Sequence, residues 1–85
     1  MKTQRKIVEE MFVATCVIMK KSDSPDYKFD TIENMSQELK SLLYTQIVNA
    51  TDLPRTTVRR IVNQYIKNEN VTDVVNDAVK RTVTM

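Results

Sequence analysis

Three arginines close together are the residues best suited to chemistry in this sequence. Arg55, Arg59 and Arg60 fall within six residues, and no acidic residue occurs between Leu53 and Asn68. The planar fork of an arginine can bind two acceptors at once, such as the O6 and N7 atoms of guanine. The net charge of the chain is only +2, so the local excess of positive charge is more informative than the total. The pattern indicates a basic surface kept clear of carboxylates.

Other kinds of chemistry lack the residues that they need. The 85 residues include no histidine, no glycine and one cysteine. A zinc site, a disulfide framework, a Ser-His or Cys-His catalytic pair and a glycine-rich phosphate cradle therefore cannot be assembled. We expect no enzyme activity, no metal site and no cofactor.

The cysteine lies in an apolar segment that also bears on location. Cys16 is surrounded by apolar residues in the run 12–19, where a lone thiol is expected to pack as a small core residue. A single unpaired cysteine suggests a reducing compartment. The run is too short to span a bilayer, and Glu9 and Glu10 stand where a signal peptide would be apolar. We expect a cytoplasmic protein.

The chain is long enough for one domain, residues 1–85, that opens with a long helix. Residues 1–21 repeat apolar side chains at helical spacing, and the positive charges of Lys20 and Lys21 suit the C-terminal end of a helix. This helix is apolar on more than one face, which a surface helix of a small monomer does not need. We expect its second face to bind a partner through Met11, Val13 and Val17.

The middle of the chain is expected to be a loop followed by helices. Residues 22–30 are rich in Ser, Asp and Pro and predict a loop. Helices should fill residues 31–53, capped at Asp30 or Thr31, and the pattern leaves open whether one helix continues or a second begins near Tyr44. Pro54 should end this region and begin a new helix.

Residues 54–69 predict a helix with two distinct faces. At about 100° per residue, the apolar side chains fall on one side and the polar ones opposite. The apolar face comprises Val58, Ile61, Val62, Tyr65 and Ile66, and the polar face Thr56, Arg59, Arg60, Asn63 and Lys67. Asn68 or Asn70 is expected to end the helix in a left-handed conformation, in place of the glycine that the chain lacks.

The last segment, residues 71–85, is expected to form a β-hairpin. It is rich in Val and Thr and is interrupted by Asn76 and Asp77, which is typical of strand, turn and strand. The register stays open between a two-residue turn at this Asn-Asp pair and a longer loop up to Lys80. In either case Lys80 and Arg81 lie near the tip.

The segment 47–71 resembles the second helix, turn and recognition helix of MarR-type bacterial transcriptional regulators. The matching residues are Ile47, Ala50, Leu53, Pro54, Arg55, Thr56, Thr57 and Val58. Asp52 and Asn70 replace two glycines of the family, and the family's C-terminal dimerisation helix has no counterpart. The resemblance implies a mainly α (α+β) fold, a winged helix-turn-helix with a long N-terminal helix and a C-terminal β-hairpin wing.

The resemblance also implies a role for each polar residue in binding double-stranded DNA. The recognition helix of the family enters the major groove, so Thr56, Arg59, Arg60 and Asn63 would contact bases. Arg55 and Thr57, in the first turn of that helix, would hold phosphates. Lys80 and Arg81, in the wing, would reach a flanking phosphate or the minor groove.

The resulting expectation is a sequence-specific transcriptional regulator, in the first place a repressor, that acts as a homodimer. One small module offers few phosphate contacts, so a dimer on a two-fold site is the usual solution. The alternative is a winged helix that binds another protein and no DNA. The operator and any small-molecule effector stay open.

Overall fold

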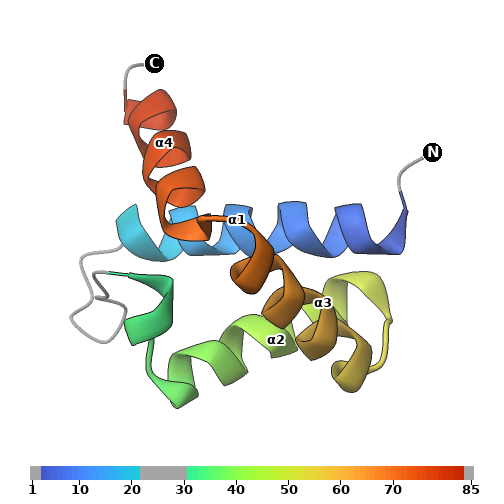
Figure 1. Ribbon diagram of the computed structural model, residues 1–85. Coiled ribbons are helices and arrows are strands. Elements are labelled where there is room, and N and C mark those ends of the chain that lie inside the picture. The colour runs from blue at the N-terminus through green and yellow to red at the C-terminus, as the bar shows by residue number, and fades with distance from the viewer. Residues whose placement is uncertain (1–2, 22–30, 84–85) are drawn as a thin grey trace.

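The computed structural model describes residues 3–21 and 31–83, and these fold into four α-helices and one short 3-10 helix (Figure 1). The helices are α1 (Gln4–Lys21), the 3-10 helix η2 (Ile32–Asn34), α2 (Gln37–Thr51), α3 (Arg55–Asn68) and α4 (Val71–Val83). In Figure 1, α1 runs across the middle of the molecule, with α2 and α3 on one side of it and α4 on the other. The predicted loop 22–30 lies outside the described residues.

The long helix α1 forms because one of its faces is continuously apolar. Val8, Phe12, Cys16 and Met19 follow one another at three- and four-residue intervals and are all buried. This stripe meets α2, α3 and α4, so α1 is the central element of the core. Burying side chains of this size stabilises a fold by about 1.5–3 kcal/mol each. The packing of α1 therefore holds the other three α-helices in place.

Two side-chain caps mark the starts of η2 and α2. The Thr31 hydroxyl accepts a hydrogen bond from the Asn34 amide at 3.3 Å and begins η2. The Ser36 hydroxyl accepts from the Leu39 amide at 3.1 Å and begins α2. The break falls at these caps and not near Tyr44, which lies inside α2. Each cap satisfies an amide that the helix itself leaves without a partner, a contribution of about 1 kcal/mol.

The predicted β-hairpin wing over residues 71–85 is wrong. Residues 71–83 form α4, and residues 3–21 and 31–83 contain no strand, so the mainly α part of the predicted fold holds and the winged part does not. Asn70 caps the helix: its Oδ1 accepts from the Asp73 amide at 3.3 Å, and its Nδ2 donates to the Asp73 carboxylate at 2.9 Å. Val71 and Val75, four residues apart, are buried against the rest of the core.

The packing of α4 also explains why its strand-like composition did not decide its structure. Val and Thr disfavour a helix by only about 0.7 kcal/mol or less per residue, and burial of one valine outweighs that. The polar residues assigned to a turn have helical partners instead. Asn76 Oδ1 accepts from Lys20 Nζ of α1 at 3.1 Å, and Asp77 pairs with Arg81 at 2.7 Å, one turn further along α4.

The end of α3 also differs from the prediction. Neither Asn68 nor Asn70 is left-handed, because the helix ends at Glu69 in an extended conformation with φ −130° and ψ 150°. Any residue can adopt this extended conformation, so the position does not require glycine. It turns the chain directly into the cap of α4, so α3 and α4 are separated by two residues only.

Candidate nucleic-acid interface

The turn between α2 and α3 is fixed by hydrogen bonds within a few residues. Asp52 is left-handed, with φ 59° and ψ 19°, and its amide donates to the Val48 carbonyl at 2.8 Å. The Thr51 hydroxyl donates to the Ile47 carbonyl at 2.7 Å and accepts from the Leu53 amide at 3.3 Å. An aspartate tolerates this backbone better than most residues with a side chain. The direction of α3 relative to α2 is therefore set locally, as in a helix-turn-helix.

The buried face of α3 holds the helix against the core. Val58, Ile61 and Val62 are buried, and Tyr65 and Ile66 are half-buried at the edge of the same face. This is the apolar face that the sequence predicted. It leaves the opposite face of α3 exposed along most of its length.

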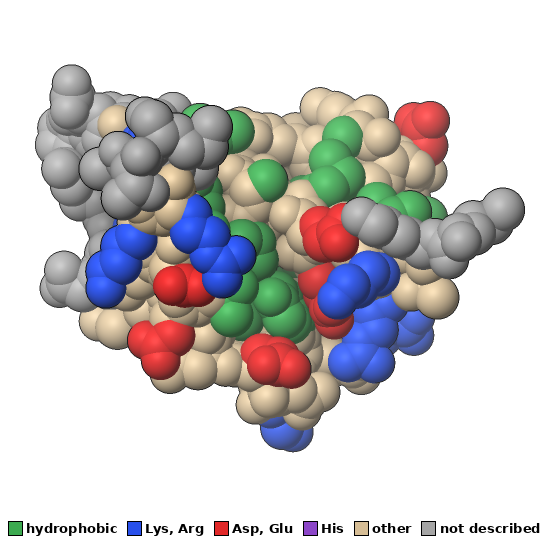
Figure 2. All heavy atoms as spheres, turned by 90° about the horizontal axis from the view of Figure 1, so that it is seen from above, with side chains coloured by type: hydrophobic (Ala, Val, Ile, Leu, Met, Phe, Trp, Pro, Cys, Tyr) green, Lys and Arg blue, Asp and Glu red, His purple; other side chains and the backbone are tan. Residues whose placement is uncertain are grey.

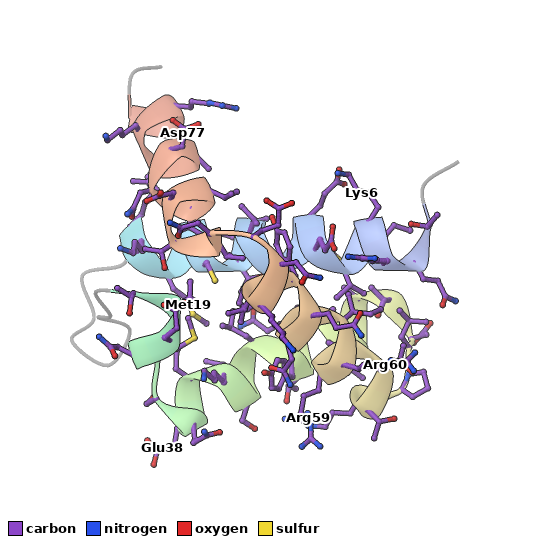
Figure 3. All side chains as sticks on the ribbon, in the orientation of Figure 1. Lys6, Met19, Glu38, Arg59, Arg60 and Asp77 are labelled. Carbon is purple, nitrogen blue, oxygen red and sulfur yellow. The ribbon has the colours of Figure 1, made fainter. Side chains whose placement is uncertain are left out.

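The exposed face of α3 carries the two arginines at its centre. Arg59 and Arg60 are exposed, and among the described residues neither forms an ion pair or a side-chain hydrogen bond. In Figure 3, Arg59 points away from α1, on the outer side of the molecule. Thr56, Asn63 and Lys67 are exposed on the same helix. The structure thus brings together the residues predicted to contact bases.

A buried tyrosine lies beneath this basic surface. Tyr44 of α2 is 7% exposed and belongs to the core. Burial raises the pKa of its hydroxyl above the ordinary value, while the positive charges of Arg59 and Arg55 act in the opposite direction. The positive charges of both arginines therefore act on one tyrosine hydroxyl.

Arg55 has a role that the sequence did not predict. Its guanidinium donates to the Ser41 carbonyl at 3.0 Å, to the Ser41 hydroxyl at 2.7 Å and to the Thr45 hydroxyl at 2.9 Å. These bonds fasten the first turn of α3 to α2. Contact of Arg55 with a phosphate stays a prediction, but the residue is first of all a clamp between the two helices.

The start of α3 offers backbone donors in place of a side-chain cap. Pro54 is the N-cap residue and no side-chain hydrogen bond caps the helix. Thr56 is exposed in the first turn, and Thr57 is half-buried. The amides of a helix N-terminus and the positive end of its dipole favour an anion.

The structure does not place Lys80 and Arg81 near this face. Both lie in the last turn of α4, with Arg81 paired to Asp77 at 2.7 Å. In Figure 1, the C-terminal end of α4 lies on the side of α1 opposite to α2 and α3. The wing that was expected to carry these two residues is not formed, because residues 71–83 are the helix α4, and a contact of Lys80 and Arg81 with DNA stays a prediction.

The three predicted dimerisation residues are divided between two sites. Met11 lines a hollow of about 320 Å³ beside Thr51 and Leu53, next to the turn of the helix-turn-helix. Val13 and Val17 line a groove of about 680 Å³ on another side of α1. The structure therefore separates Met11 from the two valines.

The groove beside α1 contains residues that were not predicted from the sequence to form a binding surface. Its apolar lining includes Ala14 and Ile18 of α1, and Val74 and Ala78 of α4. Figure 2 shows hydrophobic side chains gathered at the centre of this face, with acidic and basic side chains around them. The sequence signal for these residues was the spacing of the valines after Asn70, which fits a helix as well as a strand. Had the segment been interpreted as a helix, its valines would have been expected to pack against α1.

No second kind of site emerges from the described residues. No cluster of Cys, Asp and Glu among residues 3–21 and 31–83 could hold a metal ion. Burial raises the pKa of the Cys16 thiol to about 12, partly offset by the charge of Lys20, so the thiol stays protonated and packs as a core residue. Judged by length and hydropathy, none of the described helices could span a lipid bilayer.

Comparison of the chain with models of protein families, with curated proteins and with solved structures finds no match. Function is therefore inferred from the residues and their geometry alone.

Proposed function

We propose that this chain binds double-stranded DNA through the α2–turn–α3 helix-turn-helix and acts as a transcriptional regulator. The observation that carries the proposal is the outer face of α3, where Arg59 and Arg60 are exposed and unpaired among the described residues. An exposed arginine on a helix can pair with a carboxylate three or four residues away, and here neither arginine has an acidic residue at that spacing. The absence of catalytic residues in the sequence favours a binding protein over an enzyme.

The outer face of α3 has the side chains that major-groove recognition requires. An arginine can donate to both O6 and N7 of guanine, and an asparagine can pair with N6 and N7 of adenine. Arg59, Arg60 and Asn63 supply these groups, with Thr56 one turn earlier. Because the buried face of α3 and the Arg55 clamp fix the helix, these groups are presented without further ordering of the backbone.

The first turn of α3 supports contacts to the DNA backbone. Its amides lack a side-chain cap, and Thr56 offers an exposed hydroxyl beside them. Contacts of this kind fix the register of a protein on the duplex and make its affinity depend on salt. Thr57 and Arg55 are the further candidates, although the fork of Arg55 already binds Ser41.

In its fuller form, the proposal is that the chain acts in the cytoplasm as a homodimer that represses transcription. A module of this size offers a modest area to DNA, and specific binding usually joins two copies on a two-fold site. The exposed apolar residues of α1 supply a surface for that second copy.

The test is a titration of a random duplex at two salt concentrations, followed by fluorescence anisotropy. An operator is then selected from a random DNA library, and replacement of Arg59 and Arg60 by alanine should reduce binding to it by about 1–3 kcal/mol for each lost base contact. The affinity of the parent should fall with added salt, because each neutralised phosphate contributes about −0.9 to the logarithmic slope.

The matched control is the replacement of Lys80 and Arg81 by alanine. It removes the same charge from the far end of α4, so it should leave operator binding nearly unchanged. Equal losses in both double variants would show a general effect of net charge. No binding of the parent at about 50 mM salt would contradict the proposal and favour a protein partner for α3.

A further inference from the structure

The exposed face of α1 carries a regular stripe of side chains. Glu10, Ala14, Ile18 and Lys21 follow one another at four-, four- and three-residue intervals, and all four are exposed. Ile18 is 70% exposed, the largest value among the exposed large hydrophobic residues. Residues at this spacing lie on one side of a helix. The stripe is separate from the buried face of α1, and it leaves a large apolar side chain in water.

The stripe borders the groove of about 680 Å³ that is lined by α1, α4 and the C-terminal end of α3 at Tyr65 and Glu69. Glu10, Ala14 and Ile18 line this groove together with the half-buried Val17. The lining of this groove combines the small side chains of Ala14 and Ala78 with that of Ile18, which is 70% exposed. A surface that combines small and projecting side chains can fit a second copy of itself across a two-fold axis.

The charges along α1 have the order that an antiparallel copy requires. Glu10 lies toward the N-terminal end of the stripe and Lys21 at its C-terminal end. If two α1 helices pack antiparallel with residue numbers that sum to 31, Glu10 lies opposite Lys21, and Ala14 lies opposite Val17. The same register places Val13 opposite Ile18. A parallel arrangement would instead place like charges together at both ends.

We infer that α1 pairs with α1 of a second copy in this antiparallel register, with the two ion pairs Glu10–Lys21 at its ends. This inference deepens the dimer of the proposed function and rests on that part of it alone. The bound copy covers Ile18 and the two alanines of the groove on both sides, so each groove is closed by the other chain. The size of Ala14 lets the two helices approach closely, because a larger residue would fill the space that Ile18 and Val17 of the other copy need.

The proposed dimer leaves the helix-turn-helix exposed. Lys6 lines the groove, and in Figure 3 it points to the side of α1 opposite to α2 and α3. Arg59 points in the other direction. Dimerisation and DNA binding therefore use different surfaces and can be tested apart from each other.

The test measures the mass of the protein in solution without DNA, over a range of concentrations that reaches about 100 μM. The parent should be a dimer at the upper end. Glu10→Lys and Lys21→Glu should each raise the dissociation constant about tenfold or more, because each turns two attractive pairs into two repulsive ones. The double variant with both changes should restore the affinity of the parent. Circular dichroism should show that all three fold.

A charge-matched control and a cross-link complete the test. Glu38→Lys makes the same charge change at the start of α2 and should leave the mass unchanged. Cysteines at positions 10 and 21 should cross-link two copies, whereas a cysteine at position 10 alone should not, since the two copies of that position lie about 16 Å apart along the helix axis.

Each result decides one part of the inference. A parent that stays monomeric overturns the dimer and leaves the Arg59 and Arg60 test of DNA binding intact. A dimer in which the double charge variant is no better than the single ones, or in which cysteine at position 10 alone cross-links, overturns the antiparallel register. The antiparallel register is supported if the double charge variant recovers the mass of the dimer and cysteines at positions 10 and 21 cross-link two copies.

Discussion

The outer face of α3 and the stripe on α1 present opposite kinds of surface. On α3, Arg59 and Arg60 form a basic face without a carboxylate partner among the described residues. On α1, apolar residues lie between an acid, Glu10, and a base, Lys21. A surface of one charge suits a polyanion, whereas a surface with an apolar centre and both charges suits a protein of matching pattern. The two faces therefore point to two different partners.

The buried side of α1 connects these two surfaces. Val8, Phe12 and Cys16 pack against the helices that carry the basic face, while the exposed side of the same helix carries the stripe. One folded core thus supports both surfaces, and changes at one surface should leave the other intact. The following experiments separate the two surfaces or remove their common support.

The largest effect is expected from a charge at the centre of the α1 stripe. Ala14→Glu would place a carboxylate opposite Val17 of the second copy, where it has no partner. Burying an unpaired charge of this kind costs about 3 kcal/mol or more, so the variant should be monomeric. Sedimentation equilibrium measures the mass. Gln46→Glu on α2 adds the same charge away from the stripe and should remain dimeric. If the Ala14→Glu variant remained dimeric, the dimer interface would have to lie elsewhere.

An intermediate effect is expected when the common core is loosened by alkaline pH. The folded chain raises the pKa of Cys16 from 9.0 to about 12, so above pH 9 the unfolded chain releases this proton first. The free energy of unfolding should fall as pH rises above 9, by up to about 1.4 kcal/mol between pH 9 and 10. Burial also raises the pKa of Tyr44 and Tyr65, which adds to the loss above pH 10.

Urea unfolding below and above pH 9 checks this dependence, with Cys16→Ala as the comparison. The variant should be less stable at neutral pH because of the cavity, but its stability should change less with pH just above 9. Equal slopes for the parent and the variant would show that the thiol does not titrate differently in the folded state.

The smallest effect is expected at the clamp between α2 and α3. Arg55→Ala removes three hydrogen bonds to Ser41 and Thr45, all of them exposed, and should lower the free energy of unfolding by about 0.5–1.5 kcal/mol. Arg55→Lys keeps the charge but loses the fork, so its stability should fall by a similar amount. Urea unfolding measures both. If Arg55→Lys retained full stability, the clamp would depend on charge alone.

The sequence predicted the turn between α2 and α3 and the start of α3 well because their signals are local. Pro54 ends one helix and begins the next, and Asp52 takes the left-handed conformation between them. The apolar stripe of α3 follows from helical spacing, and so does the exposed position of Arg59 and Arg60. The clamp made by Arg55 was not predictable, since its partners are 10 and 14 residues away on another helix.

The last segment shows the limit of local signals. Val71 to Val83 has the residues of a strand, and the small differences in propensity favoured a hairpin. The hydrogen bond between Lys20 and Asn76, 56 residues apart, and the burial of Val71 and Val75 against the core favour a helix instead. The spacing of the valines fits both structures, and the partners that favour the helix lie outside the segment.

The sequence by itself determined the two faces of α3, the turn at Asp52 and the basic character of the candidate interface. These depend on side-chain spacing and on backbone preferences within a few residues. Only the tertiary structure decided that residues 71–83 are a helix, that Lys80 and Arg81 lie away from α3, and that α1, α3 and α4 line one groove. The reason is that packing between distant segments contributes more free energy than local propensity, and this packing depends on residues outside each segment.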